Sequence, residues 1–196
     1  MRSKLLDISQ NLELWDETIQ IYRDSFDEWE REDEATLLKH IKNGSYKMFA
    51  YQIEKEIVGF YILDINTPLQ YALFSFLAIK KEKRGLGLGS KLCLEAIEYF
   101  FKNLNCSWFF IEAEERQAKL YSKLGFKALD IDYRVPAFNS QKSIKMSLML
   151  LKEQTIDRDS LLSIIKDIFI RGYGLDKNDI RLEEQLQRIQ HDTRLS

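Results

Sequence analysis

Hydrophobic residues recur at helical spacing, three or four positions apart, in several stretches of the chain. The first of these stretches carries its apolar positions on one face, at Leu12, Trp15, Ile19 and Tyr22. Spacing of this kind predicts helices over residues 11–24, 33–43, 87–101, 116–124, 157–170 and 178–190. Asp7 or Ser9 is expected to cap the first helix. The N-terminal residues are therefore predicted to run straight into a polar helix.

Other stretches alternate between apolar and polar residues, or are apolar throughout, as strands are. These patterns predict strands over residues 47–53, 57–65, 71–79, 106–113, 126–135 and 143–151. The first two are separated by a short charged turn, which indicates a hairpin. The run over 71–79 contains almost no polar residue, so we expect a central strand that is covered on both faces.

The predicted elements follow an order that indicates the fold class. A strand–helix–strand unit over residues 71–113 lies between hairpin-like pairs of strands. This order predicts an α/β (α+β) fold, in which a mixed sheet carries helices on its faces. We expect one domain over residues 1–151 and a C-terminal helical extension over 152–196. The extension has an apolar stripe at Leu161, Leu162, Ile165, Ile168 and Phe169, which should be buried on the domain or on a partner subunit.

Charge and composition exclude several classes of protein. The 196 residues include 29 Lys and Arg against 31 Asp and Glu, for a net charge of -2, which argues against a general nucleic-acid-binding protein. No apolar segment is long enough for a membrane helix or resembles a signal peptide. Cys93 and Cys106 lack metal-binding spacing, and we expect both to be buried reduced thiols. These features predict a soluble, cytoplasmic protein without a metal.

A glycine-rich turn carries the clearest chemical signal. The predicted strand ends at Leu77, Ala78 and Ile79, and the next helix opens after the residues Arg84, Gly85, Leu86, Gly87, Leu88, Gly89 and Ser90. Glycines let backbone N–H groups converge, and a helix N-terminus adds partial positive charge. Such a turn is suited to bind a pyrophosphate, and an arginine can pair with phosphate oxygens.

Three other interpretations of this turn are a P-loop, a dinucleotide-binding turn and a connector without a ligand. A nucleotide-binding P-loop needs a glycine directly before its Lys-Ser/Thr pair, and the order here is Ser90-Lys91. A dinucleotide-binding turn needs the pattern G-x-G-x-x-G in a first strand–helix unit, whereas these glycines alternate in the middle of the chain. A connector without a ligand is the remaining alternative, although three alternating glycines weaken the start of a helix.

The turn resembles motif A of the GCN5-related N-acetyltransferase (GNAT) superfamily, in which a strand is followed by R/Q-x-x-G-x-G/A at the start of a helix. Arg84, Gly87 and Gly89 match this core pattern. The segment Ala118–Phe126 is similar to a second family signature, A-x-x-L/F-Y-x-K-L-G-F. The resemblance covers residues from about 5 to 151. It implies a mostly antiparallel mixed sheet with a central, splayed parallel strand pair, here 71–79 and 106–113.

The resemblance also implies a co-substrate and roles for individual residues. Acetyl-CoA would lie between the splayed strands, with its pantetheine arm on the backbone of Leu77, Ala78 and Ile79. The N–H groups from Arg84 to Ser90 would hold the pyrophosphate. Tyr121 matches the tyrosine that protonates the departing thiolate. Glu115 stands where the family often has an asparagine, which puts an expected amide contact in doubt.

The general base follows no simple pattern, because the strand before motif A contains no carboxylate. Glu30 lies in a segment, Phe26–Arg31, that resembles one placed over the acceptor site in some relatives. Glu112 lies on the second splayed strand. Both are therefore candidate catalytic residues, and a solvated surface carboxylate is the alternative for each.

The acceptor is expected to be cationic or to carry an amino group. Residues 24–34 contain seven carboxylates and one arginine, and this stretch would attract an amine if it borders the acceptor entrance. The acceptor classes are a small-molecule amine and a protein or peptide amino group, and a homodimer is a candidate assembly. Two functions remain open: an acyl-CoA-dependent, most simply acetyl-CoA-dependent, N-acyltransferase that transfers directly, and a catalytically weak acyl-CoA-binding sensor or interaction module.

Overall fold

The computed structural model describes residues 3–191, which divide into two compact units. The first unit contains the chain up to Ile65 together with Ala72–Asn105. The second contains Asn66–Tyr71 and the chain from Cys106 onward. Each unit has its own strands, helices and buried residues, and the two are described in turn.

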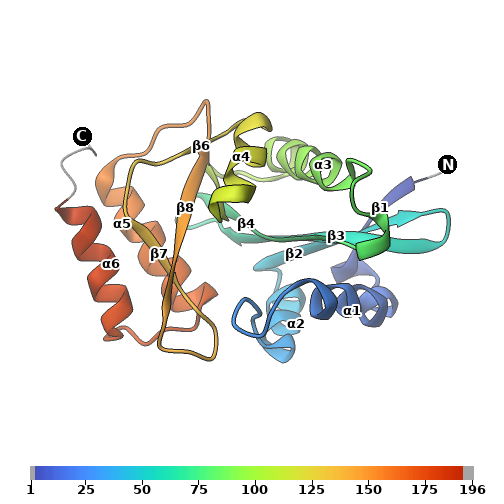
Figure 1. Cartoon of the computed structure of the whole chain (residues 1–196), viewed down its shortest axis with the longest axis horizontal. Coiled ribbons are helices and arrows are strands. Elements are labelled where there is room, and N and C mark those ends of the chain that lie inside the picture. Colours follow the sequence, from blue (N-terminus) through green and yellow to red (C-terminus); the bar gives the residue numbers. More distant parts are fainter. Residues whose placement is uncertain (1–2, 192–196) are drawn as a thin grey trace. The chain divides into compact units, whose positions relative to one another are not determined.

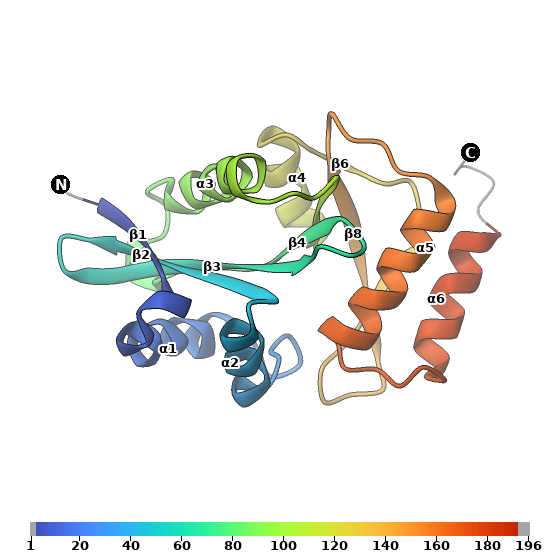
Figure 2. The same cartoon turned by 180° about the vertical axis from the view of Figure 1, so that it is seen from behind.

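Four strands and three α-helices form the first unit. The strands are β1 (Ser3–Asp7), β2 (Tyr46–Ile53), β3 (Glu56–Asn66) and β4 (Tyr71–Ile79), hydrogen-bonded in the order β1-β2-β3-β4. β2 pairs antiparallel with both β1 and β3. The helices are α1 (Trp15–Ser25), α2 (Glu34–Asn43) and α3 (Leu88–Asn103). α1 and α2 cover one face of these strands and α3 covers the other (Figure 1, Figure 2).

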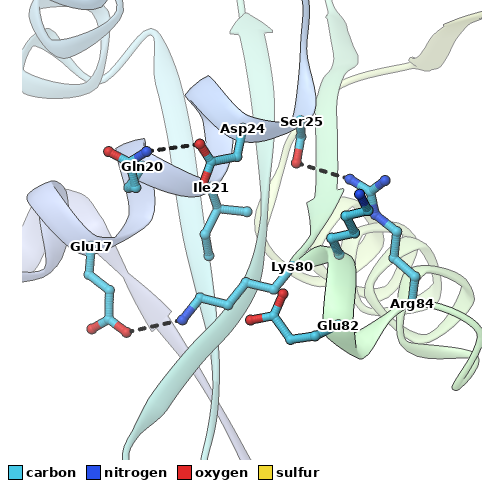
Figure 3. A pocket seen from close by; sticks show the side chains of 9 residues that line it. Glu17, Gln20, Ile21, Asp24, Ser25, Lys80, Glu82 and Arg84 are labelled. Carbon is cyan, nitrogen blue, oxygen red and sulfur yellow. Dashed lines mark hydrogen bonds and ion pairs between the residues drawn. The ribbon is translucent and has the colours of Figure 1, made fainter.

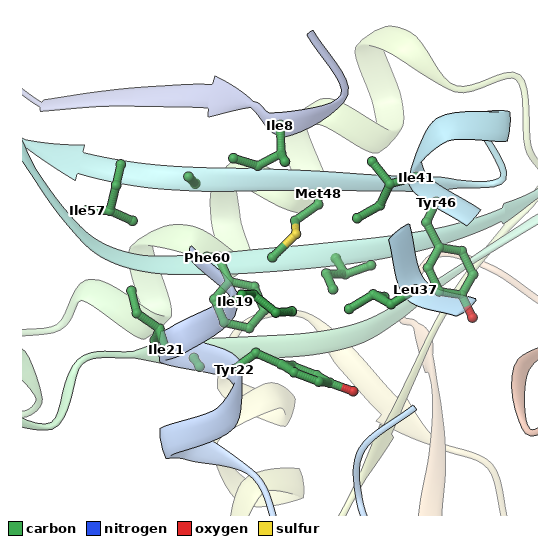
Figure 4. Close-up of a cluster of buried hydrophobic side chains, with 13 residues drawn as sticks. Ile8, Ile19, Ile21, Tyr22, Leu37, Ile41, Tyr46, Met48, Ile57 and Phe60 are labelled. Carbon is green, nitrogen blue, oxygen red and sulfur yellow. The ribbon is translucent and has the colours of Figure 1, made fainter. Parts of the chain in front are cut away.

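A cluster of buried apolar side chains joins α1 and α2 to the strands of the first unit. Tyr22, Leu37, Met48 and Phe60 are fully buried within it (Figure 4). They come from α1, α2, β2 and β3, at the positions that the helical and alternating patterns assign to the interior. The amphipathic pattern in the sequence therefore accounts for how these two helices are held on the sheet.

The two ends of α2 follow from its flanking residues. The Asp33 side chain accepts a hydrogen bond from the Thr36 backbone N–H at 3.0 Å and caps the helix. Gly44 ends the helix with φ of 82°, a left-handed conformation that glycine adopts without a steric cost. The helix expected over residues 33–43 is therefore correct to within one residue.

The N-terminus departs from the sequence-based expectation. Ser3–Asp7 forms the strand β1 and not part of a polar helix. The Asp7 carboxylate caps a short 3₁₀ turn by accepting from the Ser9 N–H at 2.9 Å, and α1 has no side-chain cap. A strand of only five residues, formed by pairing with distant β2, leaves little periodic signal. The expectation that Asp7 or Ser9 caps the first long helix is wrong.

The second unit combines four strands with the C-terminal helices. Its strands are β5 (Trp108–Ala113), β6 (Phe126–Ala128), β7 (Tyr133–Pro136) and β8 (Ser143–Leu151). β8 pairs antiparallel with β5, β6 and β7. Its α-helices are α4 (Glu115–Lys123), α5 (Arg158–Asp167) and α6 (Ile180–Gln190). The single strand expected over 126–135 is wrong, because residues 129–132 leave the strand conformation and divide β6 from β7.

The C-terminal helices are part of the second unit. Leu161, Ile165, Ile168 and Phe169 are fully buried, which confirms burial of most of the expected stripe. α5 and α6 lie side by side (Figure 1). The buried Gln185 of α6 accepts from the Arg134 N–H at 2.9 Å and donates to the Asp132 carbonyl at 3.0 Å. These bonds satisfy backbone groups beside β7, so α6 is attached by specific contacts.

The segment that follows α5 is a turn of π-helix, which is wider than an α-helix. Ile168–Gly172 forms one turn of π-helix, and the Tyr173 N–H donates to the Ile168 carbonyl at 3.0 Å. The predicted helix over 157–170 is thus α-helical only as far as Asp167. Within residues 3–191, no helix has the length and apolar character needed to cross a membrane. The cytoplasmic location stays a prediction.

Candidate active site

The glycine-rich turn connects β4 to α3 in the first unit. Gly85 and Gly87 have φ of 80° and 75°, in the left-handed region that side-chain-bearing residues rarely adopt. Gly87 occupies the N-cap of α3, where no side chain caps the helix. The first α-helical bond runs from the Lys91 N–H to the Gly87 carbonyl, so Leu88, Gly89 and Ser90 have no acceptor within the helix for their N–H groups.

The space in front of this turn is open. A Cβ atom placed on Gly85, Gly87 or Gly89 would meet no other atom within 4 Å. Gly85, Leu86 and Gly87 are exposed. An anion can therefore approach the N–H groups at the start of a 16-residue helix, where the helix dipole favours negative charge.

Arg84 is anchored beside the turn. Its Nε donates to the Ile79 carbonyl at 3.0 Å, and one of its terminal nitrogens donates to the Ser25 hydroxyl at 3.3 Å (Figure 3). These two bonds hold the guanidinium near the end of β4 and the end of α1. Nη1 takes part in neither bond and remains able to pair with a phosphate oxygen.

A cavity of about 450 Å³ lies next to Arg84, between α1 and the segment from Lys80 to Arg84. Its lining carries three acidic and three basic side chains, and the Lys80 ammonium lies 3.7 Å from Glu17 (Figure 3). The same ammonium lies 3.2 Å from Glu56, which is outside the lining. Lys83 and Lys80 hold the pKa of Glu56 below its ordinary value. The equal numbers of acidic and basic side chains leave the lining of this cavity without a net charge.

The end of β4 is set by a close approach of β3. A Cβ on Gly59 would lie 2.7 Å from the Ala78 carbonyl oxygen and 2.5 Å from Ile79 Cδ1. Only a glycine at this position allows the two strands to come so close. Ala78 and Ile79 are buried and Leu77 is partly exposed. The position of the backbone expected to contact the pantetheine arm therefore depends on Gly59.

Glu112 lies on β5 in the second unit, and two tyrosine hydroxyls donate to its carboxylate. Tyr133 donates to Oε1, and Tyr173 donates to Oε2 at 2.7 Å. Burial raises the pKa of Glu112, and the two hydroxyls act against that rise. The side chain is nevertheless partly exposed. A carboxylate that is oriented by two hydroxyls and has a raised pKa is a candidate proton acceptor.

Tyr121 lies on α4, also in the second unit. It is nearly buried, and its ring is 6.3 Å from that of Phe126. Glu115, at the first position of the same helix, is exposed and pairs with Lys119 at 3.2 Å. The structure thus places Tyr121 and Glu112 in one unit, and it places the glycine-rich turn in the other.

Glu30 belongs to the first unit and has a local role. Its carboxylate accepts from the Asp27 backbone N–H at 2.9 Å, within the turn that follows α1. Neighbouring carboxylates are also engaged: Asp33 caps α2, and Glu34 accepts from Arg23 Nε at 2.6 Å. That arginine lowers the pKa of Glu34. Much of the acidic stretch therefore stabilises the α1–α2 connection.

The cysteines have properties that oppose nucleophilic catalysis. Burial raises the pKa of Cys93 to about 12, and burial also raises the pKa of the partly exposed Cys106. The thiolate is the reactive form, so both thiols are weakly reactive near neutral pH. Among residues 3–191, no group of three or more His, Cys, Asp or Glu side chains could hold a metal ion.

A family model described as the acetyltransferase (GNAT) family matches residues 15–126 of this chain. The match spans more than half of the 196 residues and includes the glycine-rich turn and Tyr121. The chain belongs to the GNAT acetyltransferase family. The expectation of an N-acetyltransferase enzyme is confirmed by this membership.

Solved GNAT structures have the same fold. A protein from Bacteroides thetaiotaomicron, described as a GNAT-family acetyltransferase, is 18% identical with a TM-score of 0.71, over 90% of this chain and 100% of its own. Spermidine N-acetyltransferase from Vibrio cholerae, in complex with CoA and spermine, is 22% identical with a TM-score of 0.60, over 78% of this chain and 96% of its own. The expected mixed, mostly antiparallel fold is confirmed. A search of curated proteins finds no match.

Three residues, Tyr133, Tyr173 and Gly59, contact or shape the candidate site in ways that the sequence analysis did not assign to them. Tyr133 and Tyr173 reach Glu112 from 21 and 61 residues away. Gly59 lies on β3, the neighbour of β4 in the sheet, where the pairing of β3 with β2 shifts register. A glycine inside an apolar strand is a general signal of close backbone approach, and it was available in the sequence. No local pattern links either tyrosine to Glu112.

Proposed function

We propose that this GNAT enzyme uses acetyl-CoA to acetylate an amine by direct transfer. The observation that carries the proposal is the open, uncapped N-terminus of α3 behind two left-handed glycines. Exposed N–H groups, a helix dipole and Arg84 together suit a pyrophosphate group. CoA supplies the acyl group as a thioester, which an amine can attack.

The proposed roles of the residues follow their chemistry. The N–H groups from Arg84 to Ser90 bind the pyrophosphate, and the backbone of Leu77, Ala78 and Ile79 binds the pantetheine arm and polarises the acyl carbonyl. The amine nitrogen bonds to the acyl carbon and the carbon–sulfur bond breaks. Glu112 accepts the amine proton, and Tyr121 donates a proton to the departing sulfur.

Glu112 is favoured over Glu30 as the base because of its surroundings. Two hydroxyls orient its carboxylate, and its pKa is raised. The Glu30 carboxylate is occupied with a backbone N–H in its own turn. The weak reactivity of both cysteines supports direct transfer over a covalent acyl-enzyme route.

A small-molecule amine is the acceptor class that we propose, because a structural neighbour is a spermidine N-acetyltransferase bound to spermine. A peptide or protein amino group is the alternative acceptor. Another neighbouring structure is a dodecamer. We include self-association in the proposal, with a homodimer as its smallest form, and light scattering at several concentrations tests it.

The competing function is an acyl-CoA-binding sensor with little catalysis, and it is favoured by the lack of a carboxylate on β4. Thiol release from acetyl-CoA with a panel of polyamines, aromatic amines, amino acids and peptides separates the two functions. Amine-dependent release supports the enzyme. CoA binding without release from any amine supports the sensor.

Replacing Gly87 with glutamate should raise the Kd for CoA about 100-fold. The new carboxylate repels the pyrophosphate, and the left-handed backbone disfavours any side chain. Calorimetric titration with CoA measures the change. Gly44→Glu is a matched control, since Gly44 has φ of 82° and open space but ends α2. Equal CoA affinity in a folded Gly87→Glu protein would contradict the site.

A further inference from the structure

The carboxylate of Glu112 is supported from two directions by segments that are distant in the sequence. Oε1 accepts from Tyr133 on β7, and Oε2 accepts from Tyr173, which follows the π-helical turn Ile168–Gly172. Within residues 3–191, Glu112 forms no ion pair. Its orientation is therefore set by these two hydroxyls, and each oxygen keeps a second lone pair for another donor.

The ring of Tyr173 packs against one ring of the C-terminal extension and one from the loop between β7 and β8. Phe169, which is fully buried, lies 5.8 Å from Tyr173 between ring centroids, and Phe138 stacks on Tyr173 at 5.1 Å. The Tyr173 N–H closes the π-helical turn onto Ile168. A ring packed on two others loses little further freedom when its hydroxyl binds a carboxylate.

The two tyrosines differ in their exposure. Tyr133 is fully buried, and its pKa is raised well above 10 by burial and by the charge of Glu112, so it stays protonated and donates throughout the working pH range. Tyr173, Phe138 and Glu112 are each partly exposed. Of the two donors, Tyr173 is therefore the one whose side chain solvent partly reaches.

We propose that Tyr173 is a positioning residue for acyl transfer, which holds the Glu112 carboxylate ready to take the proton of the amine. This inference rests on the proposed function, in which Glu112 is the general base. It makes the C-terminal extension a contributor to the reaction: α5 and the π-helical turn set where the Tyr173 hydroxyl lies.

Other titratable groups that the structure describes near this pair are tyrosines and an aspartate–arginine pair. Tyr133 contacts Glu112 directly, and Tyr71 and Tyr173 act electrostatically on Tyr133. The Tyr71 hydroxyl donates to Asp167 at 2.6 Å, and Arg171 Nε donates to the same carboxylate at 3.1 Å, so these charges compensate one another. On the paired strand β8, the residue opposite Glu112 is the apolar Leu148.

The test is Tyr173→Phe, which removes one hydroxyl and keeps the packed ring. Loss of a hydrogen bond to the charged form should raise the pKa of Glu112 by about one unit. Carbon-13 NMR of labelled glutamate measures that pKa, with Glu112→Gln assigning the signal. The acid limb of the pH profile of kcat/KM should shift to higher pH by the same amount. At a given pH on that limb, kcat/KM should therefore fall about tenfold. The KM for acetyl-CoA should not change.

Tyr71→Phe is the matched control. It removes a hydroxyl that donates to Asp167 and accepts from Arg171 of the same extension, without touching Glu112. We expect Tyr71→Phe to lower the thermal stability and to leave the acid limb of the kcat/KM profile at the same pH. If Tyr173 had a structural role only, Tyr173→Phe would also lower the thermal stability without shifting the kcat/KM profile.

Three results would overturn the inference. An unchanged carboxyl pKa in Tyr173→Phe would show that the hydroxyl does not hold Glu112. A raised pKa with an unchanged rate profile would show that the reaction does not use this bond, and equal profiles in both variants would show a structural role only. If the wild-type enzyme released no thiol with any amine, the proposed function would fail, while the NMR titration would still decide the bond.

Discussion

Glu112→Gln should lower kcat with the amine acceptor by about 10²- to 10⁴-fold, because the proposed general base is lost. The fold should survive the change. Glutamine is close in size, its carbonyl oxygen can accept from one tyrosine, and its amide can donate to the oxygen of the other. Steady-state kinetics by thiol release, together with a melting curve, measure both effects.

The stability of this variant has a defined pH dependence. Burial raises the pKa of Glu112 above its ordinary value of 4.5, so its favourable contribution in the folded state is lost as the pH rises through the raised pKa. Glutamine does not titrate. The difference between the Tm of the variant and that of the wild type should therefore increase as the pH rises through the raised pKa of Glu112. Glu115→Gln, at an exposed glutamate of α4, is the control and should change neither rate nor Tm. Undiminished turnover in Glu112→Gln would remove Glu112 from the mechanism.

Tyr121→Phe should lower turnover by about 10²-fold or more and leave CoA binding nearly unchanged. The substitution removes the proposed proton donor for the leaving sulfur and keeps the ring that packs near Phe126. Tyr99→Phe, on α3, is a control of the same chemistry outside the proposed mechanism. Turnover can be measured with a good and a poor thiol leaving group.

The leaving group separates the role of Tyr121 from a loss of stability. A better leaving thiol needs less protonation, so the defect of Tyr121→Phe should shrink with an activated thioester. An equal defect with both thioesters, or no defect with acetyl-CoA, would assign protonation of the sulfur to water or to another group.

Sequence patterns predicted the long, regular elements well. The strands Tyr71–Ile79 and Ser143–Leu151 have the bounds expected from their apolar runs, because burial of a long run depends on little else. β1 was missed and β6 was fused to β7, since these strands are short and depend on pairing with β2 and β8. The π-helical turn after Asp167 was not predicted either, because it leaves no periodic pattern in the sequence.

In the candidate site, too, features built from consecutive residues could be located from the sequence, and contacts between distant segments could not. The turn from Arg84 to Ser90 could be located because its residues are consecutive in sequence, and α3 does begin there; phosphate binding by it stays a prediction. The surroundings of Glu112 could not, because its partners come from β7 and from beyond α5. The structural roles of Asp33 and Glu34 likewise became visible only with the positions of Thr36 and Arg23.

Gly59 has a consequence for anyone who engineers this enzyme by exchanging segments. The β2–β3 hairpin is a natural cassette for grafting from a relative, since it is continuous and its ends are close in the sheet. A donor hairpin with a larger residue at the position of Gly59 would push against the Ala78 carbonyl oxygen and displace the end of β4. A chimera of this kind could fold and still handle acyl-CoA poorly, so compatible donors should be screened first for glycine at that position.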